Sequence, residues 1–261
     1  MEALKIFFLA VLQGVTEFLP VSSSGHLAIL GKLIGFDAPG VRVEIMLHFG
    51  TLISVVIYYR ERLGKIIAGV FKGRREDWLT VAMLALGCIP AGIVYLLAGD
   101  FLEEKFDGDV RFVGCMLLVT GVVLLSLRFL PDGKSAKIGP FRALLIGCAQ
   151  AVAMLPGISR SGSTIAAARY LGVSGRDAAD FSFLMSLPIL FAAAVLQLAK
   201  DFAGDVPAEG DVGAGLLVAA VVVSAVTGYF AIRFLMRTLI GRKFWIFGIY
   251  CLAAGLVAVC L

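Results

Sequence analysis

The stretch "EFLPVSSSGH", residues 17–26, places a carboxylate, three hydroxyls and an imidazole inside an apolar N-terminal region. The residues after it, "LAILGKLIGF" (27–36), are apolar again. A second stretch, "MLPGISRSGST" (154–164), repeats the Leu-Pro, serine and glycine pattern with one extra residue. We expect both stretches to break helices, because proline ends a helix and glycine permits tight turns. These two polar stretches decide the predicted fold.

The rest of the chain has the composition of a membrane protein. Of its 261 residues, 60% are hydrophobic and 16% are charged, whereas about a quarter of the residues in soluble domains are charged. We therefore predict an all-α integral membrane protein, with the bilayer as its environment and no nucleic-acid partner. Its five cysteines lie in apolar segments without a CxxC spacing, so we expect neither a disulfide framework nor a zinc site. Six segments are long enough to cross a bilayer: 41–59, 78–98, 112–130, 181–200, 214–235 and 244–261.

The loops between these segments are of two kinds. Residues 60–77, 128–142 and 233–243 are rich in Lys and Arg, whereas residues 100–109 and 201–211 are acidic. Loops with a Lys/Arg excess face the cytoplasm. The basic loops are therefore predicted to lie inside, and the acidic loops and both termini outside.

This orientation leaves two stretches that begin and end on the same side of the membrane. Residues 1–40 start and finish outside, and residues 141–180 start and finish inside. Each holds two short apolar pieces around a polar stretch, so we predict two re-entrant hairpins that enter from opposite faces. The prediction is one membrane domain, 1–261, built from inverted repeats at about 1–130 and 141–261. Broken backbone at this depth must be buried in protein or line a wet cavity.

The polar stretches carry a set of side chains that suits phosphate chemistry. Ionisable groups at membrane depth are costly and often functional. Arg160 offers a planar fork of donors to phosphate oxygens, His26 can move protons near neutral pH, and a serine beside a base can act as a nucleophile. The structural alternative is that the serines cap helices and that Glu17 and Arg160 form an ion pair.

Further candidates for the substrate site lie nearby in the sequence. Glu44 and His48 are one helical turn apart and share a face, although hydrogen bonding between helices would explain them equally well. The expected substrate-binding residues are Gln13, Ser22, Ser24, Ser159, Ser161, Gly162, Thr164, Glu44 and His48.

Four motifs resemble the bacterial undecaprenyl pyrophosphate phosphatase family, also called the bacitracin-resistance proteins. They are "QGVTEFLPVSSSGH", "LPGISRSGSTIAAAR", "EIMLHFGTLISVV" and "DFSFLMSLP". The resemblance implies an enzyme of the bacterial inner membrane that removes the terminal phosphate of a C55 polyprenyl pyrophosphate. The product is the lipid carrier of peptidoglycan synthesis, and loss of the pyrophosphate removes the ligand of bacitracin.

The resemblance also implies roles for single residues. Glu17, Ser23, His26 and Arg160 fall on the catalytic positions. A divalent cation, Mg²⁺ or Ca²⁺, is implied at the pyrophosphate and Glu17, although some relatives have a second carboxylate where this chain has Gln13. The active site is expected to open to the outer face, and a homodimer stays an open alternative.

Two mechanisms and one rival function follow. In the first mechanism Ser23 attacks the terminal phosphorus with His26 as base, while Glu17 orients His26 or helps to hold the cation. In the second, His26 is itself the nucleophile. The rival function is a transporter or flippase of an anionic lipid or solute, because inverted repeats with broken helices are also a transporter design.

Overall fold

Helices form all the regular structure in the part of the chain that can be described. The structure is a computed structural model that describes every residue except 1, 35–40, 107–108, 132, 134–136 and 204–211. Its helices are α1 (Glu2–Phe18), α2 (Ser23–Ile34), α3 (Val41–Phe71), α4 (Arg75–Phe106), α5 (Val110–Ser126), α6 (Pro140–Val152), α7 (Arg160–Tyr170), α8 (Gly175–Ala203), α9 (Ala214–Ile240) and α10 (Ile246–Cys260), with a 3₁₀ turn, η1 (Leu127–Phe129), after α5.

Five long helices have the length and composition to cross a membrane. They cover Val43–Phe71, Arg75–Gly99, Val110–Phe129, Gly175–Leu196 and Ala214–Ile240. The prediction of a multi-pass, all-helical membrane protein is confirmed for these segments. The central part of α4 exposes apolar side chains around most of its surface, including Leu96 and Leu97 at 82% and 81% exposure, as expected of a helix that faces lipid.

The sixth predicted span is shorter than the sequence indicates. Within 244–261 the helix α10 covers Ile246–Cys260, which is 15 residues. At about 1.5 Å per residue this helix is ~22 Å long, less than the ~30 Å of a hydrocarbon core. Six full-length spans are therefore not confirmed.

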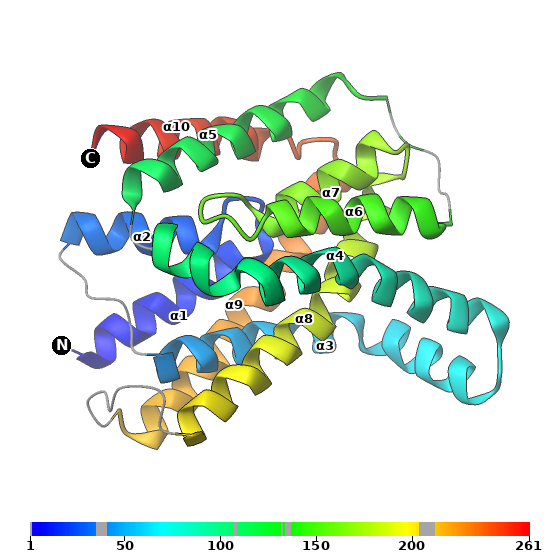
Figure 1. Cartoon of the computed structure of the whole chain (residues 1–261), viewed down its shortest axis with the longest axis horizontal. Helices are drawn as coiled ribbons and strands as arrows, with labels where there is room; N and C mark the ends of the chain where they lie inside the picture. Colours follow the sequence, from blue (N-terminus) through cyan, green and yellow to red (C-terminus); the bar gives the residue numbers. More distant parts are fainter. Residues whose placement is uncertain (1, 35–40, 107–108, 132, 134–136, 204–211) are drawn as a thin grey trace.

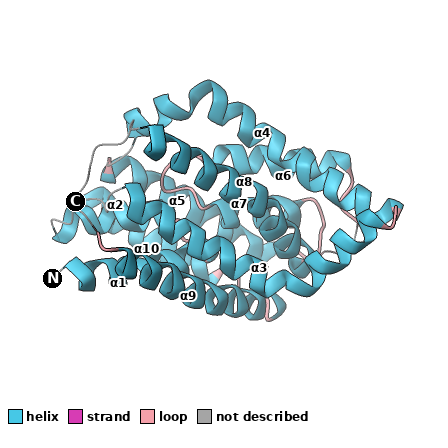
Figure 2. Cartoon of the chain, turned by 90° about the horizontal axis from the view of Figure 1, so that it is seen from below, coloured by secondary structure: helices cyan, strands magenta, loops and turns pink. Residues whose placement is uncertain are grey.

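The helices pack in pairs whose members lie far apart in the sequence. Figure 1 shows α5 and α10 side by side along one edge, and Figure 2 shows the same molecule from a perpendicular direction. Further close pairs are α1 with α9, α6 with α4, and α3 with both α8 and α9. Both termini lie at the left of Figure 1, and the turn between α3 and α4 lies at the far right.

Small residues let α5 and α10 approach closely. A Cβ atom added to Gly121 would lie 2.9 Å from the Gly248 carbonyl oxygen, and one added to Gly114 would lie 2.9 Å from that of Gly255. Close backbone approach through small residues is the usual way in which membrane helices associate.

The two polar stretches interrupt helix pairs as predicted. The first break, residues 19–22, separates α1 from α2, and the second break, residues 153–159, separates α6 from α7. Ser22 has φ +65° and Gly157 has φ +92°. The left-handed conformation is uncommon for a residue other than glycine, so the first break holds Ser22 in a strained conformation that its contacts must stabilise.

Substituting Gly248 with alanine should destabilise the protein. The new Cβ atom would meet backbone atoms of Gly121 and Leu125 at 2.7 Å, so the α5–α10 pair must separate. We expect a loss on the order of 1–3 kcal/mol, measured by thermal unfolding in detergent. Gly92→Ala in α4 is the control, because nothing lies within 4 Å of its added Cβ; equal stability of the two variants would contradict the packing.

Candidate active site at the two helix breaks

The Glu17 carboxylate is the centre of the site. Glu17 lies in the last turn of α1, and its side chain is only 6% exposed. One oxygen, Oε1, accepts a hydrogen bond from the Arg160 guanidinium of α7. The other, Oε2, accepts from the Ser23 hydroxyl at 3.0 Å and from the Gln13 side-chain amide at 3.0 Å. Residues from both breaks therefore converge on one buried carboxylate.

The serines on either side of Ser23 form the frame of the first break. Ser22 Oγ accepts the N–H of Gly25 at 3.3 Å and lies 3.3 Å from Ser24 Oγ. These contacts satisfy backbone and hydroxyl groups at the start of α2. They leave Ser23 as the serine of this group that reaches Glu17.

The second break has the same arrangement around Arg160. Ser159 is the N-cap of α7 and accepts the N–H of Gly162 at 3.2 Å, and its Oγ lies 3.3 Å from Ser161 Oγ. Arg160 stands between these serines as Ser23 stands between Ser22 and Ser24. Ser23 and Arg160, which occupy the same position in the two sequence motifs, bind different oxygens of the same carboxylate.

Direct contacts lock the breaks together. Ser161 donates to the Leu19 carbonyl at 3.3 Å, and a Cβ atom on Gly162 would lie 3.2 Å from Pro20 Cβ. Thr164 donates to the Arg160 carbonyl at 2.8 Å and lies 2.6 Å from the Ser182 hydroxyl of α8. The predicted substrate-binding residues Ser161, Gly162 and Thr164 thus join the second break to the first break and to α8.

His26 is bound by a residue that the sequence analysis missed. Its Nδ1 must donate to the Ser22 carbonyl at 2.8 Å, so in the neutral ring Nε2 accepts from the Tyr250 hydroxyl at 2.5 Å. The two rings are stacked, with centroids 5.5 Å apart. Among the described residues no hydrogen bond joins His26 to Ser23. In this structure the Ser23 hydroxyl therefore bonds to the Glu17 carboxylate and not to the His26 ring.

Gln13 links the carboxylate to α3. His48 Nδ1 donates to the Glu44 carbonyl at 3.0 Å, so its Nε2 is the acceptor for the Gln13 amide at 3.3 Å. The buried Gln13 amide therefore donates to both Glu17 and His48. His48 is thus linked to the Glu17 carboxylate through Gln13, whereas Glu44 contributes only its main-chain carbonyl to these bonds.

The cation that the resemblance implies would have few protein ligands here. Among the described residues no three His, Cys, Asp or Glu side chains lie close enough together to hold a metal ion. Mg²⁺ is, however, commonly held by one or two carboxylates together with substrate phosphates. The oxygen donors of Glu17 and Ser23 fit that kind of site, in which the pyrophosphate supplies most of the ligands.

The fold and the site together define a polytopic membrane protein in which a buried carboxylate accepts hydrogen bonds from a serine hydroxyl and an arginine at two helix breaks. The chain belongs to the family described as bacitracin resistance protein BacA, whose model matches residues 6–257. Similar proteins include one named undecaprenyl-diphosphatase from Halothermothrix orenii, 40% identical over all of this chain and 98% of the relative. Proteins of the same name from Rhodopirellula baltica and Methanococcus vannielii are 37% and 40% identical, over 98% and 97% of their lengths.

Removing one partner of the Glu17–Arg160 pair should cost more stability than removing both. Arg160→Met or Glu17→Met leaves a buried charge without its partner, which typically costs about 3–5 kcal/mol. The double variant has neither charge, so we expect its unfolding temperature to exceed that of at least one single variant. Thermal unfolding of the native protein, the two single variants and the double variant in detergent forms a double-mutant cycle. If the two single losses add up to the loss in the double variant, the two charges are not coupled.

Proposed function

We propose that this protein hydrolyses undecaprenyl pyrophosphate to undecaprenyl phosphate and inorganic phosphate. The observation that carries the proposal is the convergence of Ser23 and Arg160 on the buried Glu17 carboxylate. Membership of the BacA family and full-length similarity to proteins named undecaprenyl-diphosphatase support it. The reaction returns the lipid carrier to peptidoglycan synthesis and removes the pyrophosphate that bacitracin binds.

In the proposed mechanism the Ser23 hydroxyl attacks the terminal phosphorus and Glu17 takes its proton. The 3.0 Å hydrogen bond from Ser23 to Glu17 already directs that proton to Oε2. The bond from the terminal phosphorus to the bridging oxygen breaks, and undecaprenyl phosphate leaves with the electron pair. Water then cleaves the phosphoserine and releases inorganic phosphate, with Glu17 returning the proton to Ser23.

Arg160 stabilises the charge that develops on the phosphate oxygens. A guanidinium has five N–H donors, so it can bind the substrate while keeping its bond to Glu17. The N-termini of α2 and α7 begin at Ser23 and Arg160, and helix N-termini favour anions. This arrangement supplies fixed positive charge at the reacting phosphate.

His26 can also transfer protons, but it does so away from the Ser23–Glu17 pair. Its Nε2 is tied to the Tyr250 hydroxyl, so attack by His26 itself would first require that bond to break. We assign His26 and Tyr250 to the handling of a proton on the attacking water or the departing phosphate. A divalent cation held by Glu17 and the pyrophosphate would neutralise phosphate charge when it is bound.

The packing of the helices supports an inverted repeat in which α1–α5 correspond to α6–α10. In this repeat α1 is equivalent to α6 and α9 to α4, so the packed pair α1–α9 is equivalent to the packed pair α6–α4. The helices α5 and α10 are equivalent to each other, and they also pack together. The matched serine frames of the two breaks agree with it. We propose that α1–α2 and α6–α7 are re-entrant hairpins in the bacterial inner membrane, that α10 completes six crossings, and that the site opens outward.

Phosphate release by the purified protein in detergent tests the function, since hydrolysis needs no second compartment whereas transport does. We expect Ser23→Ala and Glu17→Gln to lose at least about 100-fold in rate, because each removes part of the nucleophile and base pair. Ser22→Ala and Ser24→Ala are the matched controls and should keep most of the rate.

A phosphoserine trapped by rapid quenching should be present in the native enzyme and absent from Ser23→Ala. Substantial turnover by Ser23→Ala would exclude the serine mechanism and favour His26 or an activated water as the nucleophile. Absence of any phosphate release from the native protein would exclude the function itself.

Single cysteines at positions 72 and 111 test the orientation. Lys72 lies in the turn between α3 and α4, within the basic stretch 60–77, and Arg111 lies at the start of α5, next to the acidic stretch 100–109. In a background without the five native cysteines, an impermeant maleimide should label Arg111→Cys in intact cells and Lys72→Cys only after permeabilisation. Labelling in the reverse order would invert the proposed topology.

A further inference from the structure

Two polar side chains, Gln13 and His48, are linked to the Glu17 carboxylate but take no part in the proposed proton transfer. The Gln13 amide nitrogen lies 3.0 Å from Glu17 Oε2 and 3.3 Å from His48 Nε2. Gln13 is only 1% exposed, so its amide is enclosed by protein. The linkage therefore connects α3 to the same carboxylate oxygen that accepts the Ser23 hydroxyl.

The tautomer of His48 fixes the direction in which the Gln13 amide faces. His48 Nδ1 lies 3.0 Å from the Glu44 main-chain carbonyl. A carbonyl oxygen can only accept, so Nδ1 carries the proton and Nε2 is an acceptor. The Glu17 carboxylate is an acceptor as well. Both neighbours therefore require the NH₂ group of the amide, whose two N–H bonds satisfy one neighbour each.

Packing against α9 fixes the distance between these two side chains. Gly14, which follows Gln13, lies so close to α9 that an added Cβ atom would be 2.6 Å from the Ser224 carbonyl oxygen. A Cβ atom added to Gly50, two residues after His48, would be 2.8 Å from Ser224 Cβ. The Ser224 hydroxyl also donates to a carbonyl oxygen of α3 at 2.9 Å. Because α1 and α3 contact the same residue of α9, the amide and the imidazole are held in register.

The second half of the chain has the same amide without a histidine. His48 stands 28 residues after the proline of the first break, and Leu184 stands 28 residues after that of the second. In this half Gln150 is 3% exposed, and neither of its side-chain amide atoms has a hydrogen-bond partner among the described residues. The amide is thus anchored in the half that carries both the histidine and the carboxylate.

We propose that His48 is a positioning residue for the reaction. Through the Gln13 amide it holds Glu17 Oε2 where the Ser23 hydroxyl delivers its proton. The role rests on the proposed function, because it requires Glu17 to be the base. It replaces the substrate-binding role expected from the sequence, since His48 acts through Gln13 and does not contact the pyrophosphate.

Loss of the imidazole acceptor would disturb the carboxylate from a distance. One N–H of the enclosed amide would have no partner, and an unpaired buried donor is costly. The amide would turn to satisfy that donor, and its bond to Oε2 would be lost or displaced. Small displacements of a reacting group lower the rate strongly.

His48→Leu tests this role, because leucine stands at the matching position of the second half and offers no acceptor. In phosphate release by the purified protein we expect kcat to fall on the order of 10-fold to 100-fold. KM should stay within about twofold of the native value, since the linkage serves the reacting geometry and not substrate binding. His48→Gln should recover most of the lost rate, because a glutamine carbonyl can accept the bond from Gln13.

A double-mutant cycle with Gln13→Leu shows whether His48 acts through the amide. Gln13→Leu should itself lower kcat, and adding His48→Leu to it should cause no further loss. Losses that multiply would mean that His48 acts by another route, and they would overturn the proposal.

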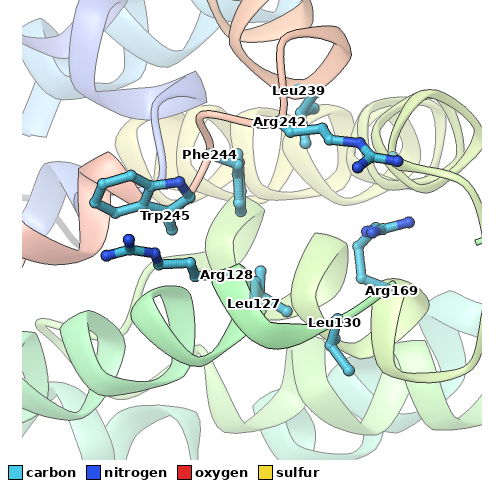
Figure 3. Close-up of a pocket in the computed structure, with 9 residues that line it drawn as sticks. Leu127, Arg128, Leu130, Arg169, Leu239, Arg242, Phe244 and Trp245 are labelled. Carbon is cyan, nitrogen blue, oxygen red and sulfur yellow. The ribbon is translucent and has the colours of Figure 1, made fainter. Parts of the chain in front are cut away.

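Leu239→Ala is the control for general destabilisation of the same scaffold. Leu239 is 8% exposed near the end of α9, and Figure 3 shows it beside a cavity that Phe244 and the η1 turn also line. It lies 15 residues after Ser224, which corresponds to about 22 Å along the helix. This variant should lower the unfolding temperature in detergent and keep its kcat.

The outcomes separate this role from the reaction itself. A native kcat in His48→Leu, a raised KM in both His48 variants, no recovery in His48→Gln, or an equal fall in Leu239→Ala would overturn the role of His48 while the reaction stands. Absence of phosphate release from the native protein would overturn the reaction and this role with it.

Discussion

The ion pair between Glu17 and Arg160 is the interaction on which the site depends. A carboxylate that is only 6% exposed is costly unless it is paired. Its partner comes from the other helix pair, 143 residues away in the sequence. The first break therefore depends on the second break to keep its buried acid paired, and the hydrogen bonds to this acid bring Ser23 and Arg160 to one place. Assembly of the fold and assembly of the site are one event.

The breaks themselves explain why so many polar residues sit in an apolar chain. Interrupting a helix frees backbone groups that lipid cannot satisfy. Ser22 and Ser159 meet part of this need by accepting backbone N–H groups. The side chain between each pair of serines is not needed for this purpose and points to Glu17. It carries a hydroxyl group in the first break and a guanidinium group in the second. Structural and chemical roles alternate along the same short stretch.

The sequence was sufficient to predict the helix breaks, because their prolines, glycines and hydroxyls contrast with the apolar chain around them. It was also sufficient to bring Glu17 and Arg160 together as candidates, since isolated charges at membrane depth are costly. It could not predict Tyr250, which is an aromatic residue in an apolar helix and carries no local signal. The start of α10 was hidden in the same way, because Phe244 and Trp245 in the preceding turn are as apolar as the helix.

The hydrogen-bond partners of His26 were not predicted, for a different reason. Ser23 and His26 are three residues apart on α2, a spacing that places side chains on neighbouring parts of a helix surface. The sequence pattern therefore favoured a hydroxyl–imidazole pair. The ring instead bonds to the Ser22 carbonyl at the strained residue of the break, and Tyr250 holds its other nitrogen. Backbone geometry at Ser22, which no residue pattern encodes directly, decides the partner.

The two halves divide the work unequally. Gln13 donates to Glu17 and His48, whereas Gln150 is buried and neither of its side-chain amide atoms bonds to the described protein. Glu17 lies four residues after Gln13. The residue four positions after Gln150 is Met154, which has no charge. The second half keeps the amide but has no acid at this spacing, and an unpaired buried amide costs about 1–3 kcal/mol. One acid accepts hydrogen bonds from both middle residues, so the first half supplies the carboxylate and the second half supplies the positive charge that makes its burial tolerable.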